Sequence, residues 1–131
     1  MSQENVEIVQ RVYEAANRSD WDAAFRAAHP EFEATFQRGP FAGTHRGREA
    51  VQARLADQRV AFDSLIMEPL ELHDSGDQVV AMIRTRLRPR GSSAEFEIRN
   101  GHLWTVRDGE ILSLVTFPSP EQALEAAGLR D

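Results

Sequence analysis

Residues 94–117, AEFEIRNGHLWTVRDGEILSLVTF, decide the fold of this chain. Apolar and polar residues alternate on both sides of Asp108-Gly109, which is the pattern of two half-buried strands. An Asp-Gly pair favours a two-residue turn, because both central positions of that turn need a positive φ. The stretch therefore predicts an antiparallel hairpin of residues 94–106 and 111–117.

The turn also predicts which residues of the hairpin share a face. If Arg107 pairs with Glu110, then His102 lies opposite Val115 and Asn100 opposite Phe117. One face is then mostly apolar, and we expect it to be the concave face that covers the core. Its predicted members are Phe96, Ile98, Asn100, His102, Trp104, Val106, Ile111, Ser113, Val115 and Phe117.

The remaining elements follow from periodicity and from helix-end signals. Apolar residues at spacings of three and four predict a helix over 3–17, and Ser19 with Asp22 resembles a capping box for a second helix that Pro30 ends. A third helix is predicted over 47–62, and a last one over 120–127 between Ser119 and Gly128. Strands are predicted over 31–37, 64–73 and 79–87. This order predicts an α+β fold with the helices on one face of a curved antiparallel sheet.

Composition excludes several classes of protein. The chain has 131 residues and no cysteine, which fits one domain, residues 1–131, without disulfides or thiolate metal sites. All 15 basic residues are arginine, and the net charge of −6 argues against nucleic acid as a partner. No apolar run is long enough for a signal peptide or a membrane helix, so we expect a soluble, cytoplasmic protein without a membrane partner.

Five short blocks, spread over essentially the whole chain, carry a family resemblance. They are residues 4–9 with 13–15, residues 20–23, residues 43–49, residues 102–109 and residues 121–129. In this order they resemble the SnoaL-like branch of the nuclear transport factor 2-like superfamily, which has the ketosteroid isomerase-like fold. The resemblance implies a cone, in which a curved sheet wraps around three N-terminal helices and leaves an internal pocket, with a short C-terminal helix. It also implies relatives that include isomerases, polyketide cyclases and epoxide hydrolases, many of them dimeric.

The catalytic residues of the ketosteroid-isomerase-like relatives do not carry over to this chain. Their helix tyrosine falls at Val12, one residue before Tyr13, and their base falls near Phe36. Their strand aspartate falls near His102. The resemblance therefore disfavours steroid isomerisation.

His102 is the candidate catalytic residue, because an imidazole can give or take a proton near neutral pH. The expected substrate-binding residues are Tyr13, Asn100, Trp104, Ser113 and Phe117. For His102 and Tyr13 the alternative is a packing role in the core. The four histidines have no metal-ligand spacing, so we expect neither a metal site nor a cofactor.

Two functions follow as hypotheses. The first is an enzyme of isomerase, cyclase or hydrolase type that applies acid–base chemistry to a small, mainly apolar organic molecule in the pocket. The second is a ligand-binding or dimerisation module without catalysis. An open pocket with a carboxylate or second histidine near His102 would favour the enzyme, and a filled cone the module.

The outer face of the sheet gives two further predictions. Leu103, Leu112 and Leu114 are expected to face outward, where either a second copy of the chain or the C-terminal helix would cover them. We favour a homodimer, in which the second copy of the chain covers these leucines. The alternation of inward and outward residues also predicts Arg–Glu pairs between strands 79–87 and 94–106. Two registers are possible: the numbers of two residues that lie opposite each other add up to 181 in one register and to 183 in the other.

Overall fold

The computed structural model describes residues 2–39 and 42–129. Within them the helices are α1 (Ser2–Asn17), α2 (Trp21–Ala24), α3 (Arg48–Arg59) and α4 (Pro120–Ala126). The strands are β1 (Ala28–Phe36), β2 (Gly43–Arg46), β3 (Phe62–Ser75), β4 (Gln78–Pro89), β5 (Phe96–Arg107) and β6 (Glu110–Phe117). None of the described helices is both long and apolar enough to cross a membrane.

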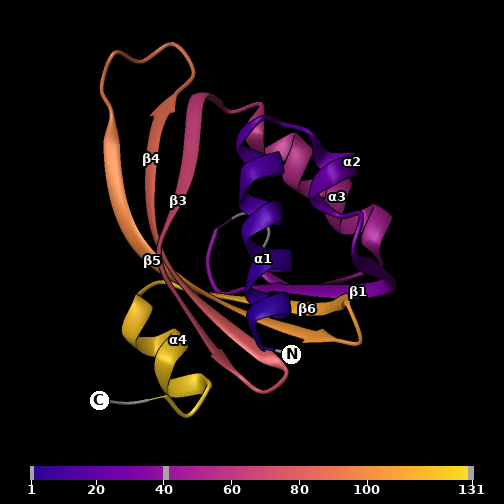
Figure 1. Cartoon of the computed structure of the whole chain (residues 1–131). Coiled ribbons are helices and arrows are strands. Elements are labelled where there is room, and N and C mark those ends of the chain that lie inside the picture. The colour runs from indigo at the N-terminus through magenta and orange to yellow at the C-terminus, as the bar shows by residue number, and fades with distance from the viewer. Residues whose placement is uncertain (1, 40–41, 130–131) are drawn as a thin grey trace.

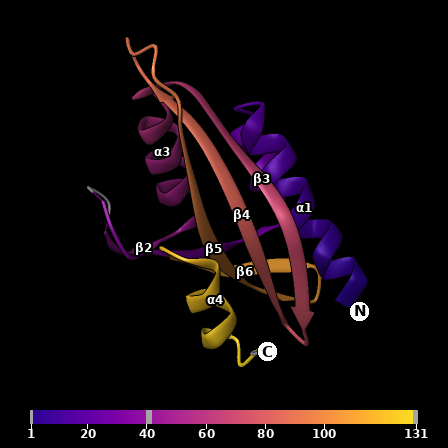
Figure 2. The same ribbon diagram turned by 90° about the vertical axis from the view of Figure 1, so that its left-hand side faces the viewer.

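The six strands form one sheet in the order β2-β1-β6-β5-β4-β3. In Figure 1, β3 and β4 run at a steep angle to β1 and β6, so the sheet curls around α1. The helices α1, α2 and α3 lie on the concave side, whereas α4 lies on the other side (Figures 1 and 2). The predicted α+β architecture is therefore confirmed.

The sheet is mixed rather than wholly antiparallel, because β1 pairs with β6 in parallel. Strand β1 begins at Ala28, so Pro30 lies within a strand and does not end the second helix as predicted. That helix is a single turn, and its N-cap is Asp20, whose side chain accepts a hydrogen bond from the Ala23 amide. The predicted cap Ser19 instead takes a positive φ of 60° at the end of α1.

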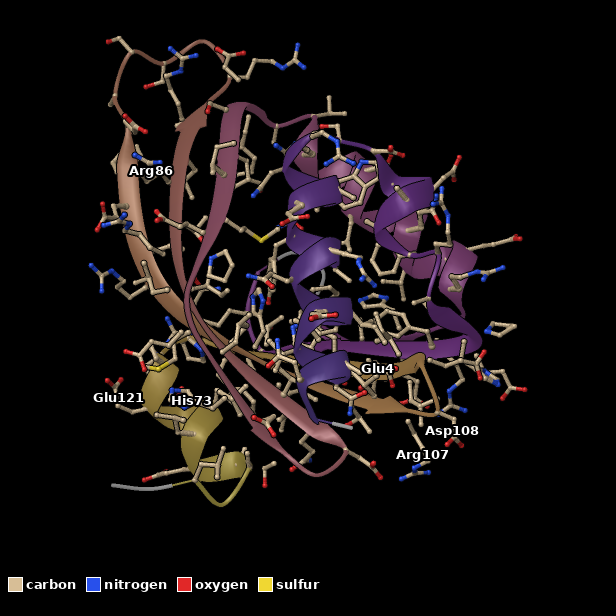
Figure 3. The ribbon with its side chains drawn as sticks, in the orientation of Figure 1. Glu4, His73, Arg86, Arg107, Asp108 and Glu121 are labelled. Atoms are coloured by element: carbon tan, nitrogen blue, oxygen red, sulfur yellow. The ribbon has the colours of Figure 1, made fainter. Side chains whose placement is uncertain are left out.

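The predicted hairpin is confirmed. Asp108 and Gly109 both have positive φ, at 54° and 79°, and Arg107 pairs with Glu110 across the turn. Figure 3 shows Arg107 and Asp108 at this end of the sheet, beyond the first turn of α1.

The predicted register of β5 with β6 fails at the third pair from the turn. A β-bulge between the pairs Val106–Ile111 and Thr105–Ser113 adds Leu112 to β6 and shifts all later partners by one residue. Thr116, not Val115, therefore lies opposite His102. The inward positions of β6 become Leu114 and Thr116. Ser113, Val115 and Phe117 move to the outer face, so their predicted inward placement is wrong.

The core lies between α1 and the concave face. Val9, Val12, Tyr13 and Ala16 on α1 pack against inward residues of the sheet, as the periodicity predicts. On β4 the odd-numbered residues face inward, and Val79, Ala81 and Ile83 are fully buried there. Phe96 and Ile98 on β5 share this face but are half exposed, at 52% and 49%, because the helices do not extend over that end of the sheet.

Helix α4 covers part of the outer face. Leu103 and Val80 are buried against Ala123, with Val115 and Phe117 packed beside them. Of the leucines predicted to form a dimer surface, Leu103 faces outward but is covered by α4, and Leu114 faces inward after the bulge. Leu112 is the extra residue of the bulge and is half-buried. Homodimer formation stays a prediction, and the three leucines do not form the continuous outer surface that was predicted for it.

In the β4–β5 register the numbers of opposite residues add up to 183, which is one of the two predicted registers. This register places Arg86 opposite Glu97. Figure 3 shows Arg86 on the side of the sheet away from the helices. Arg84 lies opposite Arg99, and its ion pair runs instead to Glu68 on β3, at 2.7 Å. The hydrogen bonds from Arg84 lower the pKa of the Glu68 carboxyl. Arg99 pairs with Glu97 on its own strand, at 3.7 Å, so Arg84 and Arg99 are two arginines of this face for which the structure shows ion pairs among the described residues.

Gly101 sets how closely α4 approaches the sheet. A Cβ at this position would lie 2.7 Å from the Ala123 Cβ and 3.0 Å from the Pro120 Cα. We predict that Gly101→Ala lowers the free energy of unfolding by about 1–3 kcal/mol through overpacking, measured by urea denaturation. Adding Ala123→Gly should recover part of the loss, and additive losses in the double variant would contradict this explanation.

Candidate functional site

A cavity of about 320 Å³ opens between the concave face of the sheet and helices α1 and α3. Its wall is mainly apolar and includes both tryptophans of the chain, Trp21 and Trp104. The cone is therefore hollow rather than filled. A cavity with an apolar wall and a few polar groups is typical of sites that bind small organic molecules.

Five side chains of the wall form one hydrogen-bonded row across α1, β4 and β5. The indole Nε1 of Trp104 donates to the Tyr13 hydroxyl at 2.9 Å, and that hydroxyl lies 2.6 Å from Nδ1 of His102. The other imidazole nitrogen, Nε2, lies 3.1 Å from Nδ2 of Asn100. Thr85 completes the row, since its hydroxyl donates to Oδ1 of Asn100 at 3.0 Å.

The direction of these bonds follows from the donors available. With the Asn100 amide oriented so that Oδ1 accepts from Thr85, Nδ2 donates to Nε2 of His102, which is then an acceptor; the opposite amide orientation would reverse both bonds. A neutral imidazole then carries its hydrogen on Nδ1 and donates it to the Tyr13 oxygen. Because the Tyr13 oxygen also accepts from Trp104, its own hydrogen has no acceptor among the described residues. The row therefore leaves one unused O–H donor, on a residue that lines the cavity.

Burial fixes the charge state of this row. Burial lowers the pKa of His102 to about 4, so the imidazole is neutral at pH 7. The pKa of Tyr13 is raised far above its usual value, mainly by burial, although the hydrogen bond from Trp104 acts in the opposite direction. The phenol therefore keeps its hydrogen at neutral pH.

The structure brings together four of the predicted site residues and separates two. Tyr13, Asn100, His102 and Trp104 line the cavity, and the predicted fall in the pKa of His102 is confirmed in direction. Ser113 and Phe117 lie on the outer face, because the bulge reverses the parity of β6. Neither Ser113 nor Phe117 lines the cavity.

Sequence reasoning missed several polar residues of the wall, among them Thr85 and Arg59. Thr85 has an inward position on β4, which its odd number in an alternating strand could have shown. Arg59 lies in the last turn of α3 and reaches the cavity through the fold, with no local signal in the sequence. No cluster of three or more metal-ligating side chains occurs in the described part of the chain.

The comparisons with known proteins agree with this architecture. The family model described as SnoaL-like domain matches residues 9–114. The chain belongs to this family. No curated protein matches its sequence.

Several solved structures share the fold over nearly the whole chain. TerC, co-crystallised with polyporic acid, has a TM-score of 0.80 at 20% identity and covers 95% of this chain and 98% of its own. An NTF2-like protein from Burkholderia thailandensis has a TM-score of 0.76 at 29% identity, with coverage of 95% and 96%. A protein of ketosteroid isomerase-like fold from Catenulispora acidiphila, in complex with trimethylamine, has a TM-score of 0.77 at 19% identity, with coverage of 95% and 94%.

The buried imidazole should make the stability of this SnoaL-like chain depend on pH. The folded chain binds fewer protons than the unfolded chain between pH 6.5 and about 4, because His102 titrates near 6.5 only when unfolded. The free energy of unfolding should therefore fall as the pH falls through this window, by up to about 3 kcal/mol from this group. Urea denaturation at pH 7 and at pH 4.5 measures the loss.

The control separates His102 from the other groups that titrate in acid. His102→Gln should lose less stability between the two pH values than the parent. An equal loss in both chains would assign the acid sensitivity to other groups.

The bond directions predict one tautomer of His102. Nitrogen NMR of the folded chain should show Nδ1 protonated and Nε2 unprotonated at pH 7. Asn100→Asp would place a carboxylate beside Nε2, which favours a hydrogen on that nitrogen. A parent spectrum with the hydrogen on Nε2 would mean that the Tyr13 hydroxyl donates to His102 and is not free.

Proposed function

We propose that this SnoaL-like protein binds a small, mainly apolar organic molecule that carries an oxygen acceptor, such as a carbonyl group. The observation that carries the proposal is the Tyr13 hydroxyl at the wall of an open, largely apolar cavity, whose hydrogen is left without an acceptor when Nδ1 of His102 donates to it. The apolar body of a ligand would be buried against the wall, and its oxygen would accept the phenolic hydrogen. A buried donor without an acceptor is unfavourable, so such a ligand supplies what the wall lacks.

Two relatives support a small molecule as the ligand class. TerC was co-crystallised with polyporic acid, and the Catenulispora protein is in complex with trimethylamine. In this chain the cavity of about 320 Å³ has the capacity for an organic molecule of about two fused rings.

Acid–base catalysis by His102 is the second candidate, because a neutral imidazole stands in the cavity wall. Two observations make it the weaker one. Both ring nitrogens already have partners, Tyr13 and Asn100, and neither partner is a carboxylate or another histidine. A base with a pKa of about 4 is also far from the value near 7 that suits proton abstraction at neutral pH. His102 then acts as a positioning residue that orients the Tyr13 hydroxyl.

A pair of probes tests the phenolic donor. 2-Acetonaphthone and 2-ethylnaphthalene have nearly the same shape, but only the ketone can accept a hydrogen bond. Tyr13→Phe should weaken binding of the ketone roughly three- to tenfold, the worth of one neutral hydrogen bond, and leave binding of the hydrocarbon within about twofold. Isothermal titration calorimetry, with ligand-observed NMR for the sparingly soluble hydrocarbon, measures both affinities.

The comparison stays valid if Tyr13→Phe is less stable, because both probes are measured on the same variant. Leu87→Trp adds bulk to the cavity wall and should abolish binding of both probes, whereas Leu70→Trp, outside the wall, should not. Absence of binding to the parent chain would contradict the proposed function. Turnover of any ligand that His102→Gln abolishes, without loss of binding, would instead support the catalytic candidate.

A further inference from the structure

The charges around the cavity differ from those of the chain as a whole. The sequence has 21 acidic residues against 15 arginines, and its net charge is −6. Among the described residues of the cavity wall there is no carboxylate, and the charged members are Arg38 and Arg59. An acidic protein thus has a cavity whose fixed charge is positive.

Arg59 is the more deeply placed of the two arginines. Its Nη2 donates to two backbone carbonyl oxygens, those of Asn17 at the end of α1 and Leu65 on β3. Its Nη1 is buried and has no hydrogen-bond partner. No carboxylate lies within ion-pair distance of Arg59 in the described chain, although other arginines, such as Arg84, are paired in this way.

An unpaired guanidinium of this kind is costly for the protein alone. Neutral carbonyl oxygens compensate only part of its charge. A buried N–H without an acceptor has lost its hydrogen bond to water and has not gained one within the protein. Burial also lowers the pKa of Arg59, which is the expected response of a cation that lacks a counter-charge. A negatively charged oxygen beside the cavity face of Arg59 would remove this cost.

We propose that the cavity selects organic anions, meaning aromatic or alicyclic carboxylates and acidic enols, and that Arg59 is the residue that anchors the anionic oxygen. This inference rests on the proposed function, since it names the class of molecule that the same cavity takes. Nη1 is covered by its neighbours and Nη2 donates to two carbonyl oxygens, so the guanidinium would have to rotate before Nη1 could reach a ligand in the cavity. Arg38, which is exposed at the edge of the cavity, adds to the positive potential that attracts the anion.

The charge of the ligand and its shape can be tested separately. 2-Naphthoate and 2-acetonaphthone have nearly the same outline, and both offer an oxygen to Tyr13, but only the naphthoate is an anion at pH 7. The parent chain should bind 2-naphthoate about tenfold more tightly than the ketone in calorimetry at low salt. Arg59→Gln should remove this preference and change binding of the ketone by less than about twofold.

Arg54→Gln is the matched control, because it removes the same charge from the same helix at a residue outside the cavity wall. It should keep the preference for the anion. If Arg59→Gln fails to fold, for want of its bonds to the two carbonyls, then Arg59→Lys carries the test. The lysine variant keeps the charge but not the planar donor pair, so it should lose about threefold in naphthoate affinity and nothing for the ketone.

The outcomes distinguish this inference from the proposed function. Equal affinities of the two probes for the parent chain, or an anion preference that survives in Arg59→Gln, would overturn the role of Arg59 and leave the proposed function standing. A parent chain that binds neither probe would overturn both.

Discussion

The contact between the Tyr13 hydroxyl and Nδ1 of His102, at 2.6 Å, joins the helical layer of this protein to its sheet. Tyr13 lies on α1 and His102 on β5, so the bond crosses the core, and the two rings are within 12° of parallel. Both side chains are almost fully buried, which makes any loss of a partner expensive. The positions of α1, of the sheet and of the polar end of the cavity therefore depend on one another through this bond.

The row of hydrogen bonds works as a unit for the same reason. Removing Thr85 or Asn100 would free Nε2 of His102 to change its tautomer, and the imidazole would then accept from Tyr13 instead of donating to it. The donor that faces a ligand is thus set by residues that need not touch it. This is why we assign His102 and Asn100 to positioning.

Much of the fold could be predicted from the sequence, because its signals are local. The Asp108-Gly109 turn, the alternation of β4 and β5 and the Ser119 cap are each specified within a few residues. The bulge at Leu112 could not be read from alternation, which assumes an unbroken period of two. A strict period of two places polar Ser113 inward and apolar Leu114 outward. This unfavourable placement was itself a signal of a bulge.

The candidate site was predictable only in part, for a different reason. Parity brought Asn100, His102 and Trp104 to one face, and periodicity placed Tyr13 on the stripe of α1 that packs there. The hydrogen-bond directions depend on distances between elements, which no local pattern contains. Arg59 reaches the cavity only because α3 packs beside the end of α1, and its bonds to the Asn17 and Leu65 carbonyls are contacts of tertiary structure.

The row also suggests how proteins of this fold can present a hydrogen-bond donor to a ligand with different residues. In the ketosteroid-isomerase-like relatives, a tyrosine and a protonated aspartate both donate to the ligand oxygen. By the resemblance, the strand aspartate falls near His102 here, and the helix tyrosine falls at Val12 rather than at Tyr13. In the proposed arrangement, hydrogen bonds into the Tyr13 oxygen from His102 and Trp104 polarise its O–H bond, so the phenol is a stronger donor than it would be alone. One donor at the end of a chain of hydrogen bonds would then take the place of two parallel donors, and no acidic side chain would be needed in this row.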